Sequence, residues 1–189
     1  GTQLVTKGFH FPELTLVGVV DADLGLEGGD LRAGERTYQQ VAQVAGRAGR
    51  GSKPGEVLIQ TRHPEAPVIA ALAAGDRDAF YSAETEMRRE AGAPPFGRWA
   101  SIIISSEDDG EAREAANRLG AFRPDVADCM ILGPAPAPMA LLRGRYRYRF
   151  LINARRSVQL QHVIRRWLTQ VDHPAGVRVA VDIDPYSFV

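Results

Sequence analysis

The sequence predicts an α/β protein in two parts, a parallel α/β unit followed by a βαββαβ domain of the split-βαβ, ferredoxin-like type. Three observations support this fold class. A nearly continuous apolar run at 14–20 is typical of a strand in a parallel sheet. Strand-like and helix-like patterns alternate between 99 and 189. Gly92 and the Pro94-Pro95 pair interrupt regular structure and mark the boundary.

The first part, residues 1–64, is expected to contain two strands of a parallel sheet with a helix between them. The predicted elements are a strand at 14–20, a helix at 31–48, a turn at Pro54-Gly55 and a strand at 56–61. The first strand (LTLVGVV) is apolar along almost its whole length, so we expect it to be buried on both faces of the sheet. Gly49 and Gly51 are expected to end the helix.

Residues 65–93 are expected to form a helical connector. Residues 66–74 are rich in Ala, Leu and Ile, which favour a helix. Asp76 is a candidate N-cap for a second helix, whose apolar and charged side chains recur at helical spacing as far as Arg88. Gly92 and the prolines after it are expected to end this helix.

The second part, residues 94–189, shows the alternation most clearly. Predicted strands lie at 100–105, 130–132, 145–153 and 177–183, and predicted helices at 110–122 and 157–171. Asp108 and Asp109 favour the start of the first helix, where the helix dipole is positive. Three prolines, Pro134, Pro136 and Pro138, predict a stiff extended connector after the second strand. Trp99 and Trp167 are expected to be core residues.

The composition is that of an ordinary globular protein, with 44% hydrophobic and 24% charged residues. No apolar run approaches the roughly 18 residues needed to span a membrane, and no secretory signal is visible. We therefore expect a cytoplasmic protein. Cys129 is the only cysteine and the four histidines lack metal-ligand spacing, so no metal site is expected in this chain.

The net charge of zero hides an uneven distribution of charge. Residues 129–171 contain no Asp or Glu but hold eight arginines. These are Arg143, Arg145, Arg147, Arg149, Arg155, Arg156, Arg165 and Arg166. A block of one sign inside a neutral chain indicates an anionic partner. The alternative is a solvated face whose counter-charges come from elsewhere in the fold.

The segment 43–50 (QVAGRAGR) carries the most chemistry. It follows a predicted helix, with Arg47 and Arg50 three residues apart and Gln43 one turn earlier. Such a pair can present two cationic forks to a triphosphate and stabilise charge in phosphoryl transfer. Gly46 and Gly49 allow close approach of the backbone to a ligand. The alternative is a plain helix C-terminus with arginines near the negative end of the dipole.

Segment 43–50 resembles motif VI (QxxGRxxR) of superfamily 2 helicases. Residues 1–8 (GTQLVTKG), with His10-Phe11-Pro12 and 14–17 after them, resemble motif V. The C-terminal segments that agree in order and spacing are Gly133-Pro134, 143–147, 160–162 and 182–185. Over essentially its whole length, the chain is similar to the primosomal protein N′ family of replication-restart DNA helicases.

This resemblance implies roles for individual residues. Residues 1–64 are then the C-terminal part of the second RecA-like helicase lobe, and 94–189 the C-terminal DNA- or partner-binding domain. The implied ATP site takes Arg47, Arg50 and Gln43 as catalytic residues and Gly8 and Gly46 beside the nucleotide. Thr2 and Lys7 are implied to face the DNA backbone.

The resemblance also indicates what lies elsewhere. The family's Walker A lysine, its DEAH-type metal-binding acid and its paired zinc-binding cysteines have no counterpart here. ATP, Mg²⁺ and zinc are therefore expected in a longer bacterial protein, of which this chain is a C-terminal piece beginning within a motif. We expect no cofactor on this chain alone and no ATPase or unwinding activity.

The segment 143–150 (RGRYRYRF) alternates arginine with glycine or an aromatic residue. In a strand, all four arginines would share one face and the aromatic residues would pack on the core behind it. Arginines at every second position are about 6.6–6.8 Å apart, which suits the backbone of single-stranded DNA. The predicted DNA-binding residues are Arg143, Arg145, Arg147 and Arg149.

Other partners fit the same arginines. By resemblance, the acidic tail of single-stranded DNA-binding protein and other primosome proteins are expected partners, together with forked or single-stranded DNA. The chain could instead belong to another superfamily 2 helicase or translocase. It could also be a docking module for DNA or protein without activity of its own.

Overall fold

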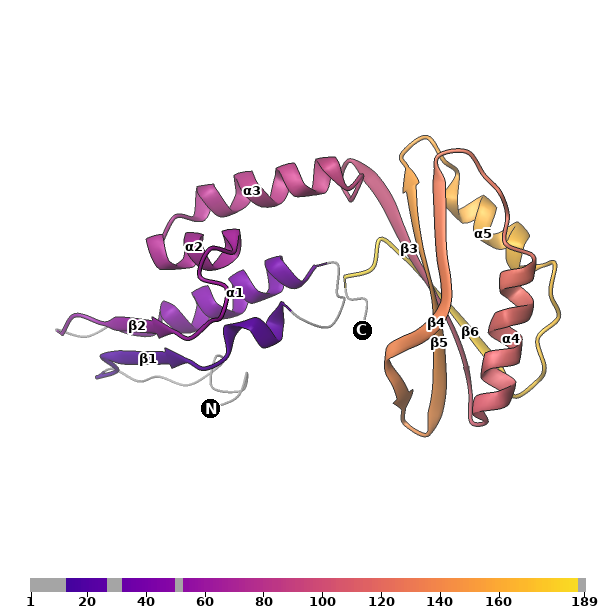
Figure 1. Ribbon diagram of the computed structural model, residues 1–189, viewed down its shortest axis with the longest axis horizontal. Helices are drawn as coiled ribbons and strands as arrows, with labels where there is room; N and C mark the ends of the chain where they lie inside the picture. Colours follow the sequence, from indigo (N-terminus) through magenta and orange to yellow (C-terminus); the bar gives the residue numbers. More distant parts are fainter. Residues whose placement is uncertain (1–12, 27–31, 50–52, 187–189) are drawn as a thin grey trace. The chain divides into compact units, whose positions relative to one another are not determined.

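The computed structural model describes residues 13–26, 32–49 and 53–186 (Figure 1). The chain divides into two compact units, one ending at Glu86 and one beginning at Met87. Each unit has its own hydrophobic core.

The first unit is built around two parallel strands. Its elements are β1 (Leu16–Val19), the 3₁₀ helix η2 (Ala22–Gly25), α1 (Ala33–Ala45), β2 (Glu56–Ile59), α2 (Pro67–Ala74) and α3 (Arg77–Glu90), which runs across the division. β1 and β2 pair in parallel, in register from Leu16 opposite Glu56 to Val19 opposite Ile59. The predicted parallel pairing is therefore confirmed.

The core of this unit lies between the strands and the helices. Phe80 of α3 is buried with Val68 and Ile69 of α2, and its ring stacks on Tyr38 of α1 with centroids 4.1 Å apart. Asp76 caps α3, because its carboxylate accepts from the backbone N–H of Ala79 at 2.9 Å. The predicted cap is confirmed.

The expected burial of the first strand on both faces is wrong for the part of the chain that the structure describes. In β1 only Val17 is buried, while Leu16, and Leu58 of β2, are exposed. The physical reason is the number of layers. The described helices pack against Val19 and Ile59 in the core cluster, and no described element of this unit covers Leu16 or Leu58.

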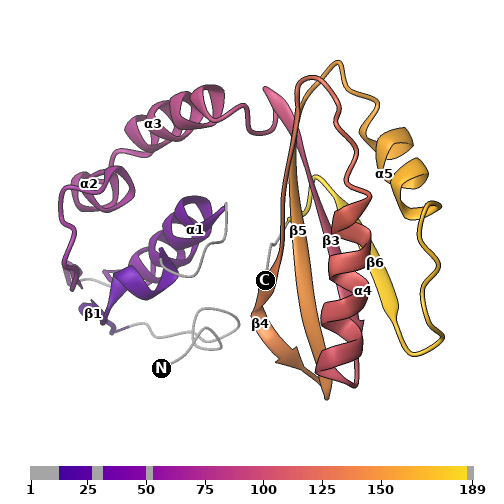
Figure 2. The ribbon, with the colours of Figure 1, turned by 45° about the vertical axis from the view of Figure 1, so that its right-hand side comes forward.

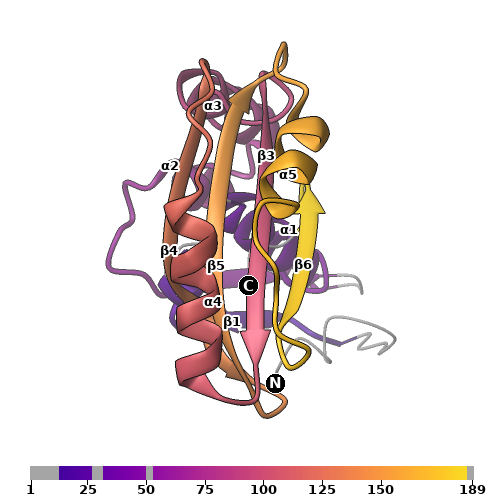
Figure 3. The same cartoon turned by 90° about the vertical axis from the view of Figure 1, so that its right-hand side faces the viewer.

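The second unit is a four-stranded antiparallel sheet with two helices. Its elements are β3 (Gly97–Ser106), α4 (Asp109–Ala121), β4 (Cys129–Leu142), β5 (Arg145–Arg155), α5 (Leu160–Leu168) and β6 (Arg178–Ile183). The strand order is β4-β5-β3-β6, as Figure 2 shows. Both helices cover the same face of the sheet (Figure 3). This is the predicted βαββαβ order in its split-βαβ arrangement.

The core of the second unit lies between the sheet and these two helices. Alternate residues of β3 and β5, among them Ile102, Ile104 and Phe150, are fully buried there. Trp167 of α5 meets Phe150 edge to face, with centroids 5.1 Å apart. Its indole N–H donates to the carbonyl oxygen of Leu119 at 2.9 Å, so α4 and α5 are tied together inside the core.

Several boundaries differ from the sequence prediction, and two in the second unit are the most informative. β4 continues to Leu142, through the prolines at 134–138 that were expected to form a connector. The edge position explains this, because only one side of an edge strand must donate hydrogen bonds and proline is tolerated there. The last helix begins at Leu160 instead of at 157.

Candidate nucleic-acid interface

The alternation predicted for β5 is present in the structure. Phe150, Ile152 and Ala154 face the helices and are buried. Side chains alternate along a strand, and the arginines stand at odd-numbered positions. Arg145, Arg147 and Arg149 therefore lie on the opposite face of the sheet. Since α4 and α5 both cover the other face, the arginines occupy the face without helices (Figure 3).

The two tyrosines of β5 point to the face of the sheet that α4 and α5 cover, but only one of them packs on the core. Tyr148 packs at the edge of the core, and its hydroxyl donates to Asp109 of α4 at 3.0 Å. Desolvation by burial, and then this bond, raise the pKa of Tyr148. Tyr146 is exposed, so the expectation that it packs on the core is wrong. It lies two residues from the turn, at the end of the sheet.

Arg143 does not lie on the strand as expected. It occupies the two-residue turn between β4 and β5 with a φ of 52°, and Gly144 follows with a φ of 75°. Two consecutive positive φ values define the tight hairpin turn whose twist matches the strands beside it. Arg143 is exposed at the tip of this hairpin.

Arg145 is held by the protein instead of projecting freely. Its Nη2 donates to the carbonyl oxygens of Ser105 at 2.9 Å and Gly176 at 2.7 Å. Its Nη1 lies 3.3 Å from a carboxylate oxygen of Glu107, and only 14% of its side chain is exposed. The expectation of a line of four equally available arginines is therefore wrong at this position, because Arg145 ties the hairpin to β3 and to the loop before β6.

The sheet register adds a residue that the sequence reasoning missed. Ser105 of β3 pairs with Arg147 on one side and with Arg178 of β6 on the other. The two arginines are thus two strands apart, about 9–10 Å, and Arg178 is exposed. Arg178 lies outside the acid-free stretch, and only its register with β3 reveals it.

The charge on this face changes along the strands. Arg149 pairs with Ile103, which pairs with Ala180. In the next row away from the hairpin, Ser101 of β3 lies between Leu151 of β5 and Asp182 of β6. Beyond the end of β6, the carboxylate of Asp184 forms an ion pair of 2.9 Å with Arg98. The positive charge is therefore concentrated at the hairpin end of the sheet.

In the first unit, the glycine- and arginine-rich segment forms the end of α1 and a turn. Gln43 is exposed in the last turn of the helix, and Gly46 is its C-cap, with its N–H donating to Ala42 at 3.0 Å. Arg47 follows in a turn instead of on the helix, and its N–H donates to Val44 at 3.0 Å. Arg47 therefore does not lie on a helical face as expected, because the helix ends at Ala45.

Gly49 has a structural reason to be glycine. Its φ is 71°, and a Cβ there would lie 2.7 Å from the backbone nitrogen of Gly55. Its N–H donates to Leu14 at 2.9 Å, so the turn is fixed to the segment before β1. Thr2, Lys7, Gly8 and Arg50 lie outside the described residues.

Asp23 was not selected from the sequence, although it follows the first strand closely. It is buried and accepts from the hydroxyl of Thr61 at 2.5 Å and the backbone N–H of Arg62 at 2.7 Å. These two bonds, that of Thr61 first, lower the pKa of Asp23. The carboxylate joins η2 to the segment after β2, at the carboxyl end of both parallel strands.

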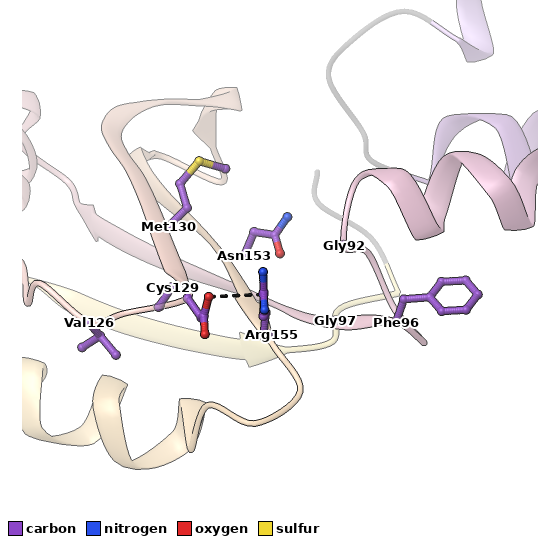
Figure 4. A pocket seen from close by; sticks show the side chains of 9 residues that line it. Gly92, Phe96, Gly97, Val126, Cys129, Met130, Asn153 and Arg155 are labelled. Carbon is purple, nitrogen blue, oxygen red and sulfur yellow. Dashed lines mark ion pairs between the residues drawn. The ribbon is translucent and has the colours of Figure 1, made fainter.

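A pocket of about 360 Å³ lies beside β4 and β5 in the second unit (Figure 4). Asp128 and Arg155 form an ion pair of 3.2 Å at its edge. Cys129 also lines it, and desolvation by burial raises the pKa of this thiol. Among the described residues, no three His, Cys, Asp or Glu side chains gather where they could hold a metal ion.

The geometry defines a class of protein: a two-unit α/β chain whose second unit carries arginines on the face of a split-βαβ sheet opposite α4 and α5. The family model described as "Primosomal protein N C-terminal domain" matches residues 89–186. The chain therefore belongs to this family.

Three similar relatives all carry the name replication restart protein PriA. The Rickettsia conorii (strain ATCC VR-613 / Malish 7) protein is 46% identical over 188 residues, covering 100% of this chain and 29% of the relative. The Treponema pallidum (strain Nichols) protein is 41% identical over 191 residues, covering 99% and 29%. The Bacillus subtilis (strain 168) protein is 37% identical over 194 residues, covering 100% and 24%.

The chain thus spans less than a third of the length of these relatives. In the described ranges 13–26, 32–49 and 53–186, no helix is both long and apolar enough to cross a membrane.

Proposed function

We propose that this chain is the C-terminal portion of an ATP-dependent DNA helicase that acts in replication restart and primosome assembly at stalled forks. The family match and the names of the relatives support this proposal. In this proposal, residues 1–64 belong to the second RecA-like helicase lobe, 65–93 form a helical connector and 94–189 bind DNA or a partner.

The role proposed for the first unit is to supply arginines to an ATP site. Arg47 and Arg50 would contact the phosphates of ATP bound by another part of the longer protein, and Gln43 and Gly46 would lie beside them. The exposed position of Gln43 and the turn that carries Arg47 at the end of α1 support this role. Mg²⁺ would be held elsewhere in the longer protein, as would zinc. Gly8, Thr2 and Lys7 keep their proposed roles beside the nucleotide and the DNA.

The role proposed for the second unit is to bind the DNA backbone. The observation that carries it is the clustering of Arg143, Arg147, Arg149 and Arg178 at one end of a sheet face without helices. Arginine guanidinium groups form charge-assisted hydrogen bonds with phosphates, and contacts to phosphate alone carry no sequence preference. Arg145 contributes mainly by holding the hairpin, because its guanidinium is engaged by protein acceptors.

A second candidate for the same surface is an acidic protein tail, such as that of single-stranded DNA-binding protein. The absence of Asp and Glu between 129 and 171 favours any polyanion. DNA is preferred because Arg147 and Arg149 stand two residues apart on one face of β5, a spacing that suits successive phosphates of a single strand, and Arg178 lies in register with Arg147 on β6.

The test compares this 189-residue chain with the longer protein that contains it. We expect this chain to bind a fluorescent single-stranded oligonucleotide but to hydrolyse no ATP, while the longer protein shows DNA-stimulated hydrolysis. An acidic peptide is added in competition. DNA-stimulated turnover by this chain alone, or binding of the peptide without binding of DNA, contradicts the proposal.

A further inference from the structure

The tip of the β4–β5 hairpin exposes apolar side chains beside arginines. Leu141 and Leu142 precede the turn, and Tyr146 follows it by two residues. The exposed fractions are 41% for Met139, 57% for Leu141, 36% for Leu142 and 36% for Tyr146. Arg143 stands between these residues at the turn itself. A charged tip would suffice for solubility, so exposed leucines beside it indicate a partner surface that is partly apolar.

The hairpin is held in place by interactions outside its own ladder. Arg145 donates to carbonyl oxygens of β3 and of the loop before β6. Arg147 donates from Nη1 to the carbonyl oxygen of Met139 at 3.3 Å. These bonds join the base of the hairpin to β3 and to the loop before β6, and join its two strands to each other.

A large bulge sets the hairpin apart from the rest of the strand. Pro136 pairs with Tyr148 and Leu141 with Tyr146, so residues 137–140 of β4 lie opposite Arg147 alone. Bulges of this kind bend a strand and redirect its side chains. Figure 1 shows β4 leaving the line of the sheet before it reaches the turn.

The cross-strand pairs distribute the tip residues over two faces. Leu141 pairs with Tyr146 on the side of the aromatic residues, and Leu142 pairs with Arg145 on the side of the arginines. An apolar edge therefore stands next to the basic sheet face, within the same acid-free stretch. A partner that offers both phosphates and apolar ring faces matches this pattern of charge and apolarity.

We propose that the hairpin tip binds the duplex end at a DNA junction, with Leu142, on the side of the arginines, unstacking the terminal base pair and Arg143 on a flanking phosphate. Proteins insert leucine and similar side chains between base steps, which unstacks the bases. A terminal base pair is stacked on one neighbour only, so its other face is open to such a side chain. This inference rests on the proposed binding of DNA by the second unit and adds the part of the DNA that the tip contacts.

The test places 2-aminopurine in a forked DNA, either in the base pair next to the junction or several pairs inside the duplex. Its fluorescence rises when it is unstacked. We expect this chain to raise the signal at the junction by roughly twofold or more and to leave the interior position unchanged. An equal response at both positions, or none at the junction although the fork is bound, overturns the proposal and leaves DNA binding intact.

Variants then assign the effect to the tip. Replacing Leu141 and Leu142 by serine should abolish the junction signal while the affinity for single-stranded DNA is unchanged. The matched control replaces Met130 and Leu132, which are 54% and 51% exposed on the same strand, and should keep the signal. Fluorescence of Trp99 and Trp167, both in the second unit, checks folding. A junction signal that survives in the folded Leu141/Leu142 variant contradicts the proposal. If the wild-type chain binds no DNA at all, the proposed function itself is contradicted.

Discussion

Arg145 and Gly176 are joined by a hydrogen bond of 2.7 Å from the guanidinium to the carbonyl oxygen, although 31 residues separate them in the sequence. The same Nη2 also donates to Ser105 of β3. One side chain thereby connects the β4–β5 hairpin, the end of β3 and the loop before β6. The sequence pattern predicts that Arg145 is one of a row of DNA-binding arginines. In the structure its guanidinium instead holds three segments of the domain together.

Replacing Arg145 by alanine should therefore destabilise the second unit by about 1.5–3 kcal/mol, the range for hydrogen bonds to a charged group. Urea unfolding followed by tryptophan fluorescence measures this, since both tryptophans lie in that unit. Arg166→Ala is the control, because Arg166 is exposed on α5, and it should change stability by less than about 0.5 kcal/mol. Equal stability of the two variants would show that the bonds of Arg145 contribute little.

Trp167→Phe should also destabilise the second unit, by about 1–3 kcal/mol, because the buried carbonyl oxygen of Leu119 loses its donor. Removing part of the indole also leaves space beside Phe150. The same urea titration applies, with Trp99 as the remaining reporter. A variant as stable as the wild type would mean that the Leu119 carbonyl finds another donor, contrary to the packing described.

Asp23→Asn should loosen the carboxyl ends of β1 and β2 at neutral pH. The hydrogen bonds from Thr61 and Arg62 favour the ionised carboxylate and lower its pKa from the ordinary value of 3.8. A lowered pKa in the folded state gives stability that is present above 3.8 and is lost as the pH falls through the folded value. Hydrogen exchange at the amide of Arg62 should therefore show lower protection in the variant at pH 7, with the difference shrinking in acid. A difference independent of pH would contradict this role.

Arg47→Ala and Arg50→Ala, made in the longer protein, should each lower kcat for DNA-stimulated ATP hydrolysis by at least ~10³ and change KM for ATP little. The reason is that charge on the transferred phosphoryl group is greatest in the transition state. Arg36→Ala on α1 is a control outside the motif. Turnover close to wild type in both motif variants would mean that these arginines serve only the end of the helix.

Much of the fold follows from periodicity in the sequence. The apolar run before Asp21 predicted a parallel strand, and β1 pairs in parallel with β2. The alternation in 143–150 predicted which side of β5 faces the core, and Phe150 is buried there. The alternation in β5 is a local feature, because the period of two in a strand depends only on neighbouring residues.

The features that could not be predicted depend on distant residues. The partners of Arg145 lie 40 and 31 residues away, so its engagement is invisible in the alternating pattern. Arg178 joins the arginine face only through the register of β6. β4 continues through its prolines because it is an edge strand, and its position in the sheet is a tertiary property.

The most direct test of the proposed DNA surface is a salt titration of single-stranded DNA binding by this chain. If about three phosphates are neutralised, log K against log[salt] should have a slope near −2, at roughly −0.7 per phosphate. Replacing Arg147 and Arg149 by glutamine should flatten the slope by about 1.4 units. The control replaces Arg165 and Arg166, which belong to the same acid-free stretch but lie on α5, and should leave the slope unchanged. An unchanged slope and affinity in the Arg147/Arg149 variant would show that the arginine face of β5 is not where this chain binds DNA.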